Sequence, residues 1–335
     1  MASPERIFIS IASYCDPMLQ FTVNSAWSRA AHPERLSFGI VDQSPPADRL
    51  QLPSDHARRH IRYVHIHPSD ARGVCWARAL AMTLYQSEEW FFQIDSHMLF
   101  EPGWDERLIA SARQCQATNP RCIVSSYPNA FEMVDGKPVP KPATTKVLAH
   151  VLKPGAVFEA EHPALSFQAM PVNQDAPVRG FHLGAGCLFA PGDFVSVLPY
   201  DPHLYFYGEE QSMAVRAFTH GWDIFHVSGL PVYHLYNIDK SARTRPLHWD
   251  EAQDKERQQR WWQIDAAAKQ RLRRLLWEGA DLGVHGLGRE RTLQDYATFS
   301  GIDYPNRALS ATAYAGTWAK PVPQPVGALQ CPSPE

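Results

Sequence analysis

Short apolar runs alternate with segments of helical periodicity along the first hundred residues of the chain. The runs are rich in β-branched and aromatic residues and end in small or polar residues, as buried strands that lead into functional loops do. We expect strands at residues 6–13, 36–43, 61–68 and 89–100, with helices at 17–31 and 71–86 between them. This alternation predicts an α/β fold with a mainly parallel central sheet flanked by helices.

The second half of the chain resumes this pattern after a long interruption. Residues 134–180 hold many of the 28 prolines and lack sustained periodicity, so we expect an irregular insertion that could serve as a lid. Further strands are expected at 181–190 and within 222–236, with helices at 209–221 and at about 250–277. The predicted organisation is a main domain over residues 1–249, a helical extension packed on it over 250–318, and a disordered tail over 319–335.

Composition excludes several classes of protein. The 32 basic and 35 acidic residues give a formal net charge of −3, which argues against a broad attraction to nucleic acid or anionic lipid. The start of the chain lacks the features of a secretory signal, and no apolar stretch reaches the length of a membrane span, so we expect a cytoplasmic protein. The six cysteines form no CxxC pair, which favours reduced thiols over a zinc knuckle or a disulfide framework.

The tripeptide Asp95-Ser96-His97 follows the apolar run FFQI. Residues two apart on an extended chain point to the same side, so Asp95 and His97 can offer an oxygen and a nitrogen to one cation. This mixed donor set suits Mn²⁺ better than Ca²⁺, and the carboxyl end of a strand is where α/β sheets bind ligands. On these three residues alone, a turn cap at Asp95 and an ordinary, partly buried histidine at position 97 are the favoured explanation.

A second polar cluster lies further along the chain. Glu209 and Glu210 open the helix expected at 209–221, and His234 stands in the strand-like PVYHLY. Carboxylates suit hydrogen bonding to sugar hydroxyls, and a second histidine could complete a metal site. The structural alternative for Glu209 and Glu210 is that the helix dipole favours acidic residues in the first turn. For His234 the alternative is an ordinary core histidine.

At this point the chain resembles the glycosyltransferases typified by the enzyme that adds N-acetylglucosamine to hydroxyproline on a ubiquitin-ligase adaptor. The matching segments, in order along the chain, are IFISIASYCDP (7–17), ARGVCWAR (71–78), QIDSHMLFEPGWDERLI (93–109), GAGCLFAPGDF (184–194), YGEEQSMAVRAFTHGWDIF (207–225), VYHLY (232–236) and RTLQDYATFSGIDY (291–304). The polypeptide N-acetylgalactosaminyltransferases are similar more distantly, in the AR helix, the DSH, the GxLFA strand, the acidic pair and the late histidine.

The resemblance implies a GT-A fold, a UDP-sugar donor, Mn²⁺ with Mg²⁺ as the alternative, and retention of anomeric configuration. The implied metal ligands are Asp95, His97 and His234. The implied donor-binding residues also include Asp95 and the acidic pair, and the others are Ala12, Ser13, Asp16, Arg78, Ser96, Gly186 and Trp222. Asp95, Glu209 and Glu210 are the expected catalytic residues. For Gly186, in the fragment GAG, the residues themselves favour a close backbone approach over dinucleotide binding.

The predicted function is therefore transfer of N-acetylglucosamine from UDP-GlcNAc to a hydroxyl acceptor on a protein, peptide or glycan. Three alternatives stay open at this level: a UDP-GalNAc-dependent transferase, a nucleotide-sugar or carbohydrate binding protein without turnover, and a metal-dependent hydrolase. The acceptor is not indicated, because acceptor surfaces lie in variable loops.

Overall fold

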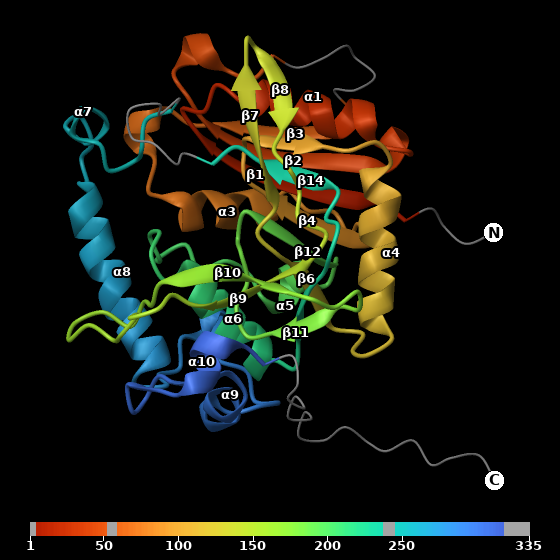
Figure 1. Cartoon of the computed structure of the whole chain (residues 1–335). Coiled ribbons are helices and arrows are strands. Elements are labelled where there is room, and N and C mark those ends of the chain that lie inside the picture. Colours follow the sequence, from red (N-terminus) through yellow and green to blue (C-terminus); the bar gives the residue numbers. More distant parts are fainter. Residues whose placement is uncertain (1–4, 52–58, 237–244, 318–335) are drawn as a thin grey trace.

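An eight-stranded mixed sheet forms the centre of the computed structural model, which describes residues 5–51, 59–236 and 245–317 (Figure 1). From one edge to the other, the sheet consists of β11 (Val178–Gly180), β13 (Asp223–His226), β6 (Cys122–Ser125), β12 (Cys187–Pro191), β4 (Trp90–Ile94), β1 (Ile7–Tyr14), β2 (Leu36–Gln43) and β3 (Ile61–His65). Strands β4, β1, β2 and β3 run parallel to one another, whereas β12 is antiparallel to both of its neighbours. The expected α/β fold is confirmed.

Helices cover both faces of this sheet. The α-helices are α1 (Leu19–Arg29), α3 (Val74–Met82), α4 (Trp104–Gln116), α5 (Phe194–Val197), α6 (Glu209–Thr219), α7 (Glu251–Asp254), α8 (Trp261–Leu276), α9 (Leu293–Ser300) and α10 (Ala311–Ala315). Helices α1 and α4 pack on one face, and α3, α6 and α8 contribute to the core on the other. The strands supply the two cores alternately: Ile7 and Ile9 of β1 enter one and Phe8 enters the other, as the two-residue period of a strand requires.

Three small sheets complete the fold. They are formed by β5 (Met98–Phe100), β14 (Val232–His234), β7 (Asn129–Val134) and β8 (Lys137–Pro140); by β9 (Val147–Leu152) and β10 (Phe167–Val172); and by β15 (Ile302–Asp303) and β16 (Ala308–Leu309). The strand expected at 89–100 is thus two strands, β4 and β5, that belong to different sheets. The interruption between them contains Asp95, Ser96 and His97.

The expectation that residues 134–180 are irregular is wrong. This segment contains β8, β9, β10 and β11, and β11 is an edge strand of the central sheet. Short strands with prolines at their ends or on an edge give little periodicity, which is why the sequence pattern did not show them. The expected strand at 181–190 begins only at Cys187.

The C-terminal part shares a core with the sheet. The helix expected at 250–277 is two helices, α7 and α8, and α8 buries Leu272, Leu275 and Leu276 in the same core as α6. Trp262 of the same helix is 55% exposed. The boundary at residue 249 stays a prediction, and the tail at 319–335 lies outside the described residues. No helix of the described part is long and apolar enough to cross a bilayer.

Candidate active site

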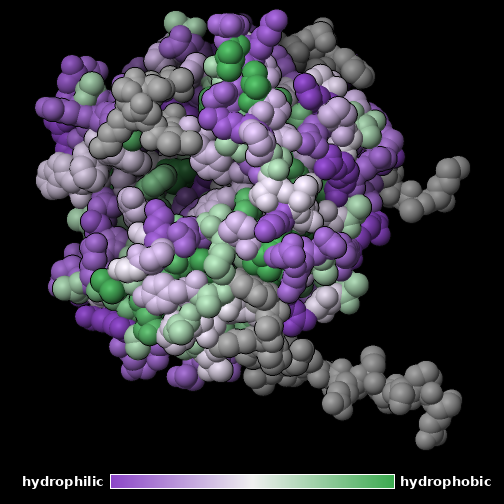
Figure 2. Space-filling model, in the orientation of Figure 1, coloured by the Kyte–Doolittle hydropathy of each residue, from purple (hydrophilic) through white to green (hydrophobic). Residues whose placement is uncertain are grey.

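A cavity of about 460 Å³ opens at the carboxyl ends of β1, β2 and β4. Its wall is completed by the N-terminal ends of α3 and α6, by β14 and by residues 245–249. Figure 2 shows the corresponding hollow in this face of the molecule. In open α/β sheets this edge is where ligands bind, so the topology by itself places a site here.

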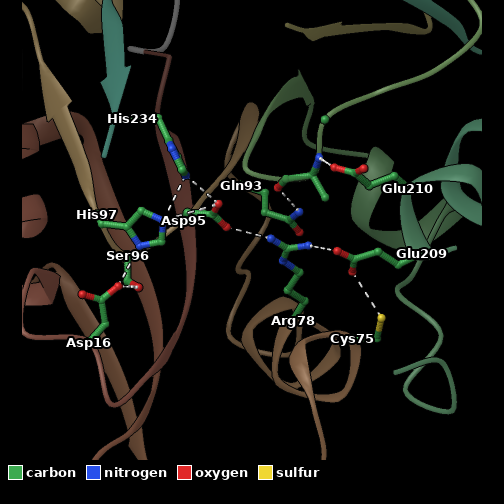
Figure 3. A network of polar contacts seen from close by, with 12 residues as sticks. Asp16, Cys75, Arg78, Gln93, Asp95, Ser96, His97, Glu209, Glu210 and His234 are labelled. Atoms are coloured by element: carbon green, nitrogen blue, oxygen red, sulfur yellow. Dashed lines mark hydrogen bonds and ion pairs between the residues drawn. The ribbon is translucent and has the colours of Figure 1, made fainter. Parts of the chain in front are cut away.

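Three side chains from two strand ends converge in the cavity: Asp95, His97 and His234 (Figure 3). Asp95 and His97 lie between β4 and β5, and β14 pairs with β5 so that His234 lies opposite Met98. His234 Nε2 lies 3.1 Å from Asp95 Oδ2 and 2.9 Å from His97 Nε2, and His97 Nε2 lies 3.8 Å from Asp95 Oδ2. The structure thus brings together the three residues that the resemblance implied as metal ligands.

Asp16 holds the ring of His97 from behind. Its Oδ2 accepts hydrogen bonds from His97 Nδ1 at 2.7 Å and from Ser96 Oγ at 2.7 Å. Burial opposes the ionisation of Asp16, but the bonds from His97 and Ser96 and the nearby positive charge of Arg245 together outweigh it and lower the pKa of this carboxyl group. With Nδ1 bonded to Asp16, Nε2 of His97 is the nitrogen that faces His234, as in a carboxylate–histidine pair that supports a metal.

The donor set fits a divalent transition ion. Two imidazole nitrogens and a carboxylate oxygen form a mixed set that Mn²⁺ accepts, whereas Ca²⁺ prefers oxygen ligands alone. Burial lowers the pKa of His234, so this imidazole is neutral and can ligate. Burial disfavours the charged form of Asp95, yet the bond from His234 and the charge of Arg78 lower its pKa and keep it ionised.

Arg78 connects this cluster to the acidic pair. Its Nη2 lies 2.9 Å from Asp95 Oδ1 and its Nη1 lies 2.6 Å from Glu209 Oε1, with only 4% of the arginine side chain exposed. Burial raises the pKa of Glu209 to about 6 even though the charge of Arg78 opposes the shift. Glu209 Oε2 also accepts from the neutral Cys75 thiol at 3.2 Å.

Glu210 and Gly186 lie close to this bridge. Glu210 Oε1 accepts from the amide of Ala185 at 2.8 Å, and Glu210 lines the cavity. A Cβ atom at Gly186 would lie only 2.5 Å from Asp95 Oδ2, and the Gly186 carbonyl accepts from the Asp95 amide at 3.2 Å. The close backbone approach expected at Gly186 is therefore to Asp95.

Two of the implied donor-binding residues do not reach the cavity. Strand β1 continues to Tyr14, so Ala12 and Tyr14 line the cavity while Ser13 between them is fully buried on the other side. Trp222 is 1% exposed and packs edge-on against Phe194 in the core, with ring centroids 5.6 Å apart. The assignment of Ser13 and Trp222 to the donor site is therefore wrong for their side chains.

Sequence reasoning missed other lining residues. Arg245 Nη2 lies 3.0 Å from His97 Nε2, and Arg245 Nε lies 3.8 Å from Asp16 Oδ2. Gln43, at the end of β2, also lines the cavity and donates from Nε2 to the Ser13 carbonyl at 2.9 Å. Arg245 lies in the segment RPLHW at 245–249, shortly before α7. Nothing in the local pattern of this segment indicates that it returns to the sheet, so the sequence offered no usable signal for Arg245.

Comparison with known proteins agrees with this geometry. A family model described as Glycosyltransferase (GlcNAc) matches residues 44–306. The chain belongs to this glycosyltransferase family. The match spans the DSH tripeptide, the acidic pair and His234, so most of the cavity lining lies in the matched part of the chain, and Ala12, Tyr14, Asp16 and Gln43 precede it.

A solved structure shares the fold. The crystal structure of GalNAc-T7 with UDP, GalNAc and Mn²⁺ is similar over 82% of this chain, with a TM-score of 0.57 and 12% sequence identity. The chain matches only 49% of the length of that protein. No curated protein matches the chain. Together these findings show a glycosyltransferase with a GT-A fold.

Proposed function

We propose that this protein transfers N-acetylglucosamine from UDP-GlcNAc to a hydroxyl acceptor, with a divalent metal and with retention of anomeric configuration. The observation that carries the proposal is the convergence of Asp95, His97 and His234 at the carboxyl edge of a GT-A sheet. The name of the matching family supports GlcNAc, and the presence of UDP and Mn²⁺ in the GalNAc-T7 crystal structure supports a UDP donor and that metal. The narrower resemblance to the hydroxyproline-modifying enzyme stays a prediction.

The three ligands would hold Mn²⁺, or Mg²⁺ in its place, and the ion would supply positive charge to the diphosphate leaving group. Arg245 lies on the same side of the cavity, where its guanidinium adds a second positive charge for the diphosphate. Ala12, Tyr14 and Gln43, at the ends of β1 and β2, form the wall that would bind the nucleoside.

Glu209 and Glu210 would bind the sugar. Arg78 fixes Glu209, and the Ala185 amide fixes one oxygen of Glu210, so the second oxygen of Glu210 is the one available to a sugar hydroxyl. Because Glu209 is already paired with Arg78 and Cys75, we assign it a binding role and no covalent one. Attack by the acceptor from the face of the leaving group agrees with retention.

The test is UDP release by the purified protein from a panel of UDP-sugars, with Mn²⁺, with Mg²⁺ and with chelator. Slow hydrolysis reports the donor even when the true acceptor is missing. Mn²⁺-dependent release from UDP-GlcNAc alone is the expected result. Faster release from UDP-GalNAc would mean that UDP-GalNAc, and not UDP-GlcNAc, is the donor. A failure to bind or turn over any UDP-sugar would reject the proposal. Binding without turnover under all conditions would indicate a binding protein. Efficient hydrolysis of the UDP-sugar that no acceptor increases would indicate a hydrolase.

A further inference from the structure

Aromatic rings form one side of the cavity mouth. They are Phe206, Tyr207 and Trp249, which we call the aromatic shelf, and all three line the cavity. Phe206 is 41% exposed and Tyr207 is 67% exposed, although aromatic side chains are normally more buried. The centroid of the Phe206 ring lies 5.6 Å from that of Tyr207 and 5.0 Å from that of Trp249, so the three rings form one contacting cluster.

The base of the shelf is buried and hydrogen-bonded. Tyr205, directly before the shelf, is 3% exposed, and its hydroxyl pairs with His248 Nδ1 at 2.7 Å. His248 Nε2 in turn pairs with the Ala71 carbonyl at 3.1 Å. The two chain segments that carry the shelf are therefore fixed to each other and to the loop before α3.

The Tyr207 end of the shelf adjoins the acidic pair that would bind the sugar. Tyr207 is followed by Gly208, which caps the start of α6 with a φ of +87°. Glu209 and Glu210 are then the first two residues of α6. Figure 3 shows this acidic pair across Arg78 from His97 and His234. Since the rings carry no charge, they are unsuited to the diphosphate, and the position of Tyr207 beside the acidic pair suits an acceptor that meets the transferred sugar.

Polar side chains also line the cavity, on a segment that is bonded to α6 through Leu165 and Gln211. Lys153 at the end of β9 and Ser166 before β10 are exposed, line the cavity, and are joined by a bond from the Lys153 amide to the Ser166 carbonyl at 2.9 Å. The cavity that holds the aromatic rings therefore also offers an ammonium group and a hydroxyl group. A pyranose ring matches this combination, because its faces carry C–H groups and its rim carries hydroxyls.

We propose that the aromatic shelf and the Lys153–Ser166 pair form an acceptor subsite for a pyranose ring, so that the acceptor is a carbohydrate. The inference rests on the proposed function and names the acceptor class for the same site. In the reaction, the acceptor oxygen bonds to the anomeric carbon of GlcNAc while the bond from that carbon to the β-phosphate oxygen breaks. The acceptor's hydroxyl proton passes to the departing phosphate oxygen, and the products are UDP and the new glycoside.

The experiment uses methyl glycosides of glucose, galactose, mannose and N-acetylglucosamine, and as the second arm serine, threonine and hydroxyproline peptides. UDP release from UDP-GlcNAc with Mn²⁺ is measured with each, and binding is followed by saturation-transfer NMR in the presence of UDP and Mn²⁺. We expect at least one glycoside to raise UDP release tenfold or more above hydrolysis and to give a saturation-transfer signal. The newly formed disaccharide should appear by mass spectrometry.

The variants Phe206→Ala and Tyr207→Ala locate the subsite. Each should raise the KM for the active glycoside at least tenfold while changing the KM for UDP-GlcNAc less than threefold. The matched control is Trp262→Ala, which removes an exposed aromatic ring that does not line the cavity and should leave both constants unchanged.

Three results would overturn the inference: stimulation by peptides alone, no binding of any glycoside, or glycoside kinetics unaffected by both shelf variants. Loss of UDP binding in the wild-type protein would instead reject the proposed function, so the two failures are distinguishable.

Discussion

Replacing Arg78 with methionine should destabilise the protein by about 3–5 kcal/mol at pH 8, the usual cost of leaving a buried charge without its partner. Arg78 Nη1 pairs with Glu209 at 2.6 Å, and the exposed fractions of the two side chains are 4% and 8%. Asp95, on the other side of the arginine, is 28% exposed and can regain water more easily. Most of the loss should therefore come from Glu209.

The double variant Arg78→Met with Glu209→Gln tests this division, because it removes both charges and should recover at least half of the lost stability. The single variant should also lose less stability at pH 5 than at pH 8. Without Arg78 the folded-state pKa of Glu209 rises further above its ordinary value of 4.5, so the penalty exists only while the carboxyl group is ionised.

Urea unfolding followed by tryptophan fluorescence measures both effects. A loss of unfolding free energy below about 1 kcal/mol for Arg78→Met at pH 8, or no recovery in the double variant, would refute the account of a buried ionic bridge. A loss that small is typical of a solvent-exposed ion pair.

Three further predictions concern the metal cluster and the acidic pair. Asp16→Asn weakens the support of His97 and should lower Mn²⁺ affinity about 10–100-fold, measured by calorimetry; an unchanged affinity would contradict the role given to Asp16. Gly186→Ala places a methyl group 2.5 Å from Asp95 Oδ2 and should lower Mn²⁺ affinity at least tenfold by displacing that carboxylate, which electron paramagnetic resonance of free Mn²⁺ can check. Glu209 has a folded-state pKa raised to about 6, so its contribution to stability is complete below pH 4.5 and is lost as the pH rises through 6. The stability difference between wild type and Glu209→Gln should therefore shift by about 2 kcal/mol between pH 4.5 and 7.5, from 1.36 kcal/mol per pKa unit, and equal slopes in urea titrations would show that Glu209 does not titrate in this range.

The metal cluster was predictable because its signal is local and its placement follows from topology. Asp95 and His97 follow a buried strand, and parallel strands bring their carboxyl ends to one edge of a sheet. His234 was predictable only through the family resemblance, because its position depends on the pairing of β14 with β5, which the sequence pattern does not show.

The errors have physical causes of the same kind. Ser13 was misplaced because β1 continues one residue further than the apolar run, and the alternation of a strand then turns its side chain away. Trp222 follows a Gly that ends α6, and whether such a ring enters a core or a cavity depends on distant neighbours such as Phe194. Arg245 and the aromatic shelf were missed because loops return to a site through tertiary contacts that leave no periodicity.

The charges of the cavity indicate how donor and metal should depend on each other. Four carboxylates face three basic side chains, which leaves a charge of −1 when the histidines are neutral; these are Asp16, Asp95, Glu209 and Glu210 against Arg78, Lys153 and Arg245. A cavity of this charge repels a diphosphate, whereas one divalent ion brings the sum to +1 and makes the cavity attract it. We therefore expect Mn²⁺ to raise UDP affinity at least tenfold, with a reciprocal effect of UDP on Mn²⁺ affinity, because binding linkage is symmetric. Calorimetric titration of each ligand with and without the other measures the coupling, and equal UDP affinity in Mn²⁺ and in chelator would show that the diphosphate binds outside the cluster of Asp95, His97 and His234.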